Sequence, residues 1–145
     1  EELAALAAGA SQPLTGELRM SVIPTIAPFM LPAVLPQLRR ERPELKLFLR
    51  EEPSAQACDS LHHGQVDCVL LALPYACGDV GSAVLFDDPL LVAFPGDFPG
   101  DLPAVVSADT LDPAQLLMLE DGHCLKDHAL AACNRPELRS GTRMM

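Results

Sequence analysis

The segment GELRMSVIPTIAPFMLPAVLPQLRRERPELKLFLREE, residues 16–52, decides the expected fold. Period-two and helical apolar patterns in it and just after it predict five elements: a strand at 18–25, a helix over 27–42, a strand at 45–52, a helix over 54–63 and a strand at 66–73. This βαβαβ order predicts an α/β fold with a parallel sheet, because helical crossovers return each strand in the same direction.

The chain after this segment is expected to cross into a second lobe. Two short apolar pieces, AVLFDD (83–88) and LLVAFP (90–95), are predicted as strands, and the Pro-, Gly- and Asp-rich stretch 95–103 as a surface loop. LLMLEDG (116–122) is predicted as a strand ending in a turn, and HCLKDHALAAC (123–133) as a helix that begins there.

We therefore expect three regions along the chain. Residues 1–16 are predicted as the end of a linker helix and a linker, 17–90 as the first lobe, and 91–145 as part of a second lobe that carries the helix 123–133.

Composition restricts the possible functions. Ten Lys and Arg against 20 Asp and Glu give a formal charge of −10, which argues against this segment binding nucleic acid itself. No apolar run approaches the roughly 18–20 residues needed to span a bilayer, and Glu1–Ala10 lacks the basic start of a secretory signal. We expect a cytoplasmic location without membrane contact.

The cysteine pattern favours a reducing compartment. Their number is odd and their spacing irregular, so at least one is expected to be a free thiol. The five are Cys58, Cys68, Cys77, Cys124 and Cys133.

Two separated stretches resemble one family. Residues 16–52, with LHHGQVDCVLLAL (61–73), resemble the start of the effector domain of LysR-type transcription regulators, whose fold is like a type 2 periplasmic binding protein. LMLEDGHCLKDHALAAC (117–133) resembles the redox loop of the peroxide-sensing OxyR branch, with a His-Cys pair after an acidic turn and a second Cys nine positions on.

The resemblance implies a function and partners. It implies that hydrogen peroxide oxidises Cys124, which then forms a disulfide with Cys133, and that the refolded segment re-orients effector domains paired as dimers or tetramers. DNA would be bound only by an N-terminal winged helix-turn-helix, which is absent before Glu1, and the second lobe is expected to be incomplete after Met145. RNA polymerase and thiol reductants are further implied partners, no cofactor is implied, and the protein is not expected to be an enzyme.

The charged residues around Cys124 have opposing effects on this chemistry. A thiol reacts with peroxide as the thiolate, and the first turn of a helix stabilises negative charge. His123 and Lys126 could add positive charge, whereas Asp127 and the preceding acids Glu120 and Asp121 oppose it. On an intact helix, nine residues separate two positions by about 13 Å, so a disulfide would require the helix to unwind or bend.

Two hydroxyls are candidates for peroxide binding. Thr25 follows the first strand and Ser54 the second, so both could face one cleft at the carboxyl ends of the strands. The OxyR branch usually has Thr at both places. Both hydroxyls could equally cap the helices that follow them.

Other interpretations remain open. Cys58, Cys68 and Cys77 are predicted to be small apolar side chains. Zinc held by Cys124 and His128, with His62, His63 or Cys133, is a less favoured alternative. A LysR-type domain that binds a metabolite without redox switching, and a thiol peroxidase, are the competing functions.

Overall fold

The structure is a computed structural model that describes residues 15–107, 110–112, 116–117 and 123–132. The chain divides into two compact units, Glu1–Gly78 and Asp79–Met145. The predicted linker at 1–16 lies almost wholly outside the described residues, and the predicted lobe boundary at residue 90 stays a prediction.

The first unit is built around a three-stranded parallel sheet with the order β2-β1-β3. Its elements are β1 (Gly16–Val22), α2 (Ala27–Glu41), β2 (Leu45–Glu51), α3 (Ser54–His62) and β3 (Cys68–Leu70). The predicted α/β class, element order and parallel pairing are confirmed. The third strand is shorter than the predicted 66–73.

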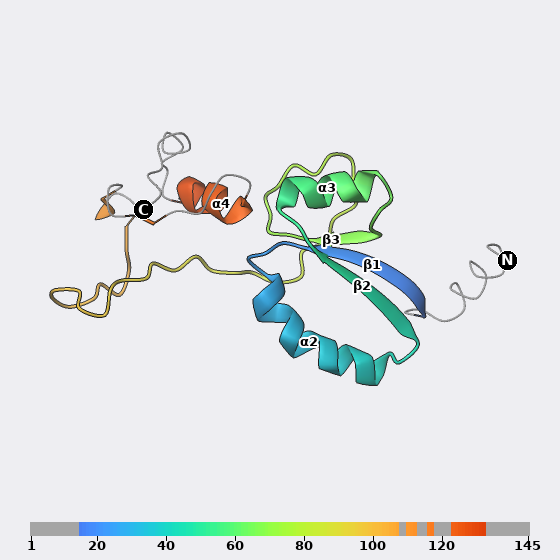
Figure 1. The fold of residues 1–145 in the computed structure, drawn as a ribbon. Helices are drawn as coiled ribbons and strands as arrows, with labels where there is room; N and C mark the ends of the chain where they lie inside the picture. Colours follow the sequence, from blue (N-terminus) through green and yellow to red (C-terminus); the bar gives the residue numbers. More distant parts are fainter. Residues whose placement is uncertain (1–14, 108–109, 113–115, 118–122, 133–145) are drawn as a thin grey trace. The chain divides into compact units, whose positions relative to one another are not determined.

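The central strand β1 is paired along its whole length with β2, from Gly16 opposite Leu45 to Val22 opposite Glu51. Its last three residues also pair with β3. Because β1 is the central strand, the connection from β1 to β2 and the connection from β2 to β3 cross the sheet in opposite directions. Figure 1 shows their helices, α2 and α3, on opposite sides of the sheet. The carboxyl ends of the strands therefore meet at one edge.

The core of this unit lies where β1 ends and α3 begins. Val22, Ile23, Ala57 and Val66 are each at most 2% exposed. Burial of these apolar side chains provides the main stabilisation and fixes the position of α3 against the sheet.

Helix α2 continues through two internal prolines. Pro28 lies in its first turn, and Pro32 and Pro36 follow at intervals of four residues. This spacing places all three on one face, and all three are exposed. Water can reach the carbonyl groups that lack a helical N–H partner there, which makes internal prolines tolerable.

The predicted strands at 83–88 and 90–95 are wrong. Neither segment has regular secondary structure, and Val84, Leu85 and Leu91 are 74%, 68% and 88% exposed. A strand needs a partner to satisfy its backbone groups, and no sheet pairing among the described residues involves these segments. The apolar pattern alone was therefore insufficient.

The second unit contains α4 (Cys124–Ala132), which confirms the predicted helix at its described positions. Residues 95–103 form no helix or strand, as expected of a loop. Of the predicted strand 116–122, only Leu116 and Leu117 are described, and neither is in a strand.

Candidate functional site

Polar side chains follow β1 and β2 at the edge where these parallel strands end. Thr25 lies in the turn between β1 and α2 and is partly buried, and Ser54 is the first residue of α3. Neighbouring parallel strands end at the same edge, which is the usual position of ligand sites in open α/β sheets.

The hydroxyl of Ser54 is buried without a hydrogen-bond partner. Ser54 is 1% exposed, and no described atom bonds its Oγ. A buried hydroxyl left unpaired costs about 1–3 kcal/mol. Such a group is available to a small polar ligand.

The helix-cap interpretation of these two hydroxyls is wrong. The N-cap of α3 is Pro53, which places Ser54 inside the helix, and no side chain caps this end. The N-cap of α2 is Ile26, and no side-chain hydrogen bond caps it either. Each helix begins one residue away from the position that capping by Ser54 or Thr25 would need.

A buried carboxylate supports the start of α3. Glu52 is 6% exposed, and its Oε2 accepts a hydrogen bond of 2.8 Å from Ser21 Oγ in β1. Its Oε1 accepts bonds from Ser60 Oγ (3.1 Å) and Gln56 Nε2 (3.4 Å) in α3. Glu52 thus connects the central strand to the helix that carries Ser54. This role of Glu52 could not be predicted from the sequence, because an acid at the end of a strand resembles an ordinary surface residue.

Cys124 is the first residue of α4, as predicted. Its thiol forms no disulfide, and the residue is 3% exposed. The first turn of a helix carries backbone N–H groups that have no acceptor four residues earlier within the helix. The thiol therefore has the helical position that the predicted oxidation requires.

The neighbours of Cys124 occupy different environments. His123 is partly buried, Lys126 is 5% exposed and Asp127 is exposed. The backbone N–H of Lys126 donates a hydrogen bond of 3.1 Å to the carbonyl of His123, which closes the first turn. Cys133 lies outside the described residues. The prediction that Thr25, Ser54 and Cys124 line one cleft concerns two separately described units and stays a prediction.

Residues 11–145 match the family model described as the LysR substrate binding domain. The chain belongs to this family. In this LysR-type domain, Thr25 and Ser54 follow the ends of strands, and Cys124 is the first residue of a helix.

The LysR-type domain is similar to several regulators. It is 37% identical over 144 residues to the HTH-type transcriptional regulator EstR of Acinetobacter baylyi, covering 99% of the chain and 48% of the relative. It is 37% identical over 128 residues to the DNA-binding transcriptional dual regulator OxyR of Escherichia coli, covering 88% and 42%. A relative from another Escherichia coli strain, with the same identity and coverage, is named hydrogen peroxide-inducible genes activator. The chain thus spans less than half of these relatives.

A solved structure supports the same relationship. Full-length OxyR from Pseudomonas aeruginosa, a single-site variant, matches with a TM-score of 0.78 and 34% identity, covering 97% of this chain and 50% of that one. The resemblance to the OxyR branch is thereby confirmed for the LysR-type domain.

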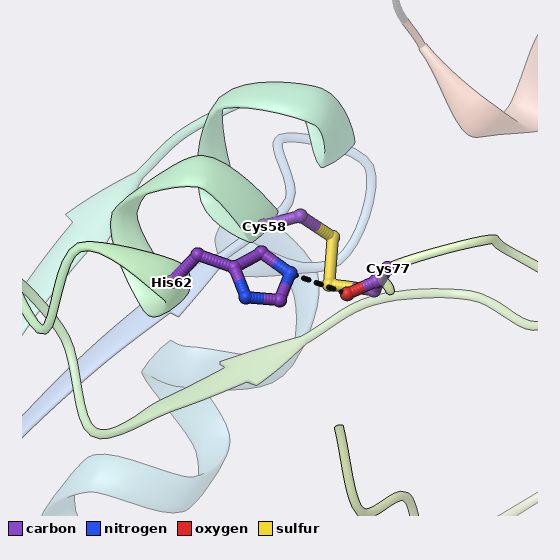
Figure 2. The surroundings of a disulfide bond; sticks show 3 residues. All are labelled: Cys58, His62 and Cys77. Carbon is purple, nitrogen blue, oxygen red and sulfur yellow. Dashed lines mark hydrogen bonds between the residues drawn. A yellow bond between two sulfur atoms is a disulfide. The ribbon is translucent and has the colours of Figure 1, made fainter. Parts of the chain in front are cut away.

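The prediction that Cys58 and Cys77 are simple apolar side chains is wrong. They form a disulfide, with 5.4 Å between their Cα atoms, that joins α3 to the segment after β3 (Figure 2). Nineteen residues separate them in sequence. This spacing carried no signal, because the sequence did not indicate that the chain turns back onto α3 after β3.

Cys68, in contrast, is a free, partly buried thiol in β3. Burial, and then the negative charge of Asp67, raise the pKa of the Cys68 thiol above its ordinary value. A raised pKa leaves less thiolate at neutral pH, which agrees with the predicted structural role of Cys68.

We expect Cys68 to be alkylated more slowly than a free cysteine at neutral pH. Its rate should rise with pH and level off only above the pH at which an ordinary thiol does, because the thiolate is the reacting form. Asp67→Asn should accelerate the reaction only modestly, since burial is the larger cause. Iodoacetamide labelling between pH 7 and pH 10, read by peptide mass spectrometry, measures both; a Cys68 profile equal to that of a model thiol would contradict the assignment.

Within the described ranges, no group of three or more His, Cys, Asp or Glu side chains is arranged to hold a metal ion. None of the helices described is both long and apolar enough to cross a membrane.

Proposed function

We propose that this domain is the peroxide-sensing regulatory part of a LysR-type transcription regulator. The observation that carries the proposal is the free, buried thiol of Cys124 at the first position of α4. The relatives named OxyR and hydrogen peroxide-inducible genes activator support it. Peroxide is small enough to approach a thiol that is only 3% exposed.

The proposed reaction has two steps. The Cys124 thiolate attacks one peroxide oxygen, the O–O bond breaks, and a sulfenic acid and water form after proton transfer. Cys133 then attacks the Cys124 sulfur, a disulfide forms, and a second water leaves. His123, Lys126 and Asp127 would tune the charge around the sulfur.

Thr25 and Ser54 are the proposed peroxide-binding hydroxyls. Ser54 Oγ is buried and has no bonding partner among the described residues, so it can donate a hydrogen bond to a peroxide oxygen or accept one from it. Thr25 lies at the same edge of the sheet.

The disulfide would force a conformational change. Cys124–Ala132 is one helix, and a helix continued by one residue would separate the Cα atoms of Cys124 and Cys133 by about 13 Å. A disulfide needs them within about 7 Å. Bond formation therefore favours a state in which α4 is partly unwound, and this change is the proposed signal.

The proposals for the whole protein follow from the relatives. We propose a cytoplasmic homo-oligomer, dimer or tetramer, that binds DNA through an N-terminal winged helix-turn-helix, contacts RNA polymerase, is reset by thiol reductants and does not act as an enzyme. Exposed apolar side chains of α2, Phe29 (80%) and Val34 (41%), are compatible with subunit contacts.

A second candidate function is a metabolite-binding effector domain without redox switching. The unpartnered hydroxyl of Ser54, which suits any small polar ligand, favours it, and the relative EstR is named as a transcriptional regulator without reference to peroxide. Such a domain would not depend on Cys133. A thiol peroxidase is the weakest alternative, because it would require turnover with a dedicated reductant.

Trapping of the first product tests the proposal. After stoichiometric peroxide, Cys133→Ser should accumulate a Cys124 sulfenic acid that a dimedone-type reagent labels, because no resolving thiol remains. Cys124→Ser is the control and should give no label at this peptide. Equal absence of label in both variants would favour the metabolite-binding function.

A further inference from the structure

The segment that leaves β3, residues 71–78, lies against α3 and is held at Cys77. Cys58 and His62 are four residues apart, so they lie on the same face of α3. Cys58 binds Cys77 through the disulfide, and His62 Nε2 lies 2.7 Å from the Cys77 carbonyl oxygen. Figure 2 shows both side chains directed toward Cys77.

Gly78 extends this contact by one residue. Its φ of +74° favours glycine, and a Cβ at this position would lie 2.8 Å from His62 Nε2. We call Cys58, His62, Cys77 and Gly78 the α3 latch. It fastens the last residues of the first unit, after which the chain enters the second.

We propose that Cys58 and Cys77 are a second thiol–disulfide site, which exchanges with low-molecular-weight thiols and disulfides of the glutathione type. The proposal rests on the proposed function in one respect, because a cytoplasmic regulator meets a reducing environment. In that compartment disulfides are usually transient and responsive to redox conditions.

The two sulfurs differ in access, which sets the order of the exchange. Cys58 is 6% exposed, whereas Cys77 is partly exposed. The Cys77 thiolate attacks a glutathione disulfide, expels one glutathione thiolate and forms a mixed disulfide. The Cys58 thiolate then attacks Cys77 Sγ and expels the second glutathione. The protein loses two electrons and two protons, and glutathione disulfide is reduced to two glutathione molecules.

Reduction would loosen the exit segment without unfolding α3. The disulfide restrains a stretch of chain with no regular structure from residue 71 to residue 78. Without the disulfide, the segment keeps the His62 hydrogen bond and the close approach of Gly78 to His62. These noncovalent contacts restrain the segment less than a covalent bond does, so it opens more often. The α3 latch thereby makes the opening of residues 71–78 depend on the thiol–disulfide ratio, independently of peroxide at Cys124.

The test uses the full chain carrying Cys68→Ser, Cys124→Ser and Cys133→Ser, so that only Cys58 and Cys77 of the α3 latch exchange with glutathione. Glutathione buffers of varied ratio are equilibrated with it, and thiols are counted by alkylation and peptide mass spectrometry. We expect Cys58 and Cys77 to change together, from 10% to 90% oxidised over about an 80-fold change in [GSH]²/[GSSG], as a two-electron couple requires. Amide exchange in residues 71–78 should be about tenfold faster in the reduced form.

Matched variants separate the latch from general stability. His62→Ala should make the disulfide about fivefold easier to reduce, because the bond that keeps Cys77 near Cys58 is lost. His63→Ala is the control, since the His63 ring bonds Asp59 O within α3. Gly78→Ala should act like His62→Ala.

Two results would overturn the proposal: thiols that stay reduced at every ratio, or a disulfide that survives dithiothreitol under native conditions. Peroxide labelling of Cys124 in a Cys58→Ser, Cys77→Ser, Cys133→Ser variant, which lacks the resolving thiol, tests the proposed function separately. Loss of glutathione exchange with retained Cys124 labelling refutes only the latch, and the reverse pattern refutes only the peroxide sensor.

Discussion

Ser54→Ala should lower the rate constant for oxidation of Cys124 by peroxide about tenfold, because one hydrogen bond to the reacting peroxide is worth about 1.4 kcal/mol. The same change should leave the free energy of unfolding within about 1 kcal/mol of its original value or raise it, since the lost hydroxyl is buried without a partner. Stopped-flow peroxide kinetics and urea unfolding measure the two effects.

Two variants control for this result. Ser54→Thr keeps the hydroxyl and should retain most of the rate. Ser60→Ala removes a hydroxyl that donates to Glu52 Oε1, so it should lower stability while leaving the peroxide rate nearly unchanged. Equal peroxide rates in Ser54→Ala and the unaltered protein would exclude Ser54 from the peroxide site.

Glu52→Ala should destabilise the first unit by about 3 kcal/mol, because it leaves the buried hydroxyls of Ser21 and Ser60 without their acceptor. Glu51→Ala is the matched control. Glu51 is the adjacent residue of β2 and is exposed, so its loss should change stability by about 0.5 kcal/mol or less.

Urea unfolding followed by tyrosine fluorescence measures how Glu52→Ala changes the stability of the first unit. The chain contains one tyrosine and no tryptophan, and Tyr75 lies within the first unit. A shifted midpoint with an unchanged slope indicates a change in stability. Equal midpoints for Glu52→Ala and Glu51→Ala would show that the buried hydrogen bonds contribute nothing.

The parallel sheet and α4 could be predicted because their signals are local. The apolar alternation of 18–25 and 45–52 gave β1 and β2, and the turn before His123 gave the start of α4. The helix over 27–42 was correctly predicted despite its prolines, since these lie on the exposed face of α2. These features depend on neighbours in sequence.

The features that escaped prediction depend on distant partners. Segments 83–88 and 90–95 have strand-like composition, but no described strand pairs with them. The buried position of Glu52 required knowledge of Ser21, 31 residues away. Ser54 was placed at the right strand end, but whether its hydroxyl capped the helix depended on a shift of one residue in the helix start.

The disulfide Cys58–Cys77 could not be predicted from the sequence for a similar reason. Its pairing follows from the return of residues 71–78 onto α3, which no composition or periodicity encodes. Cys124, in contrast, was assigned through its own short motif, and its helical position is confirmed.

Peptide mapping of the reduced, unaltered chain after stoichiometric peroxide tests the central claim most directly. The account predicts a crosslinked peptide pair containing Cys124 and Cys133, and the absence of this pair in Cys124→Ser. Recovery of both cysteines as free thiols, whether other cysteines react or not, would contradict the peroxide switch and leave a ligand-binding LysR-type domain.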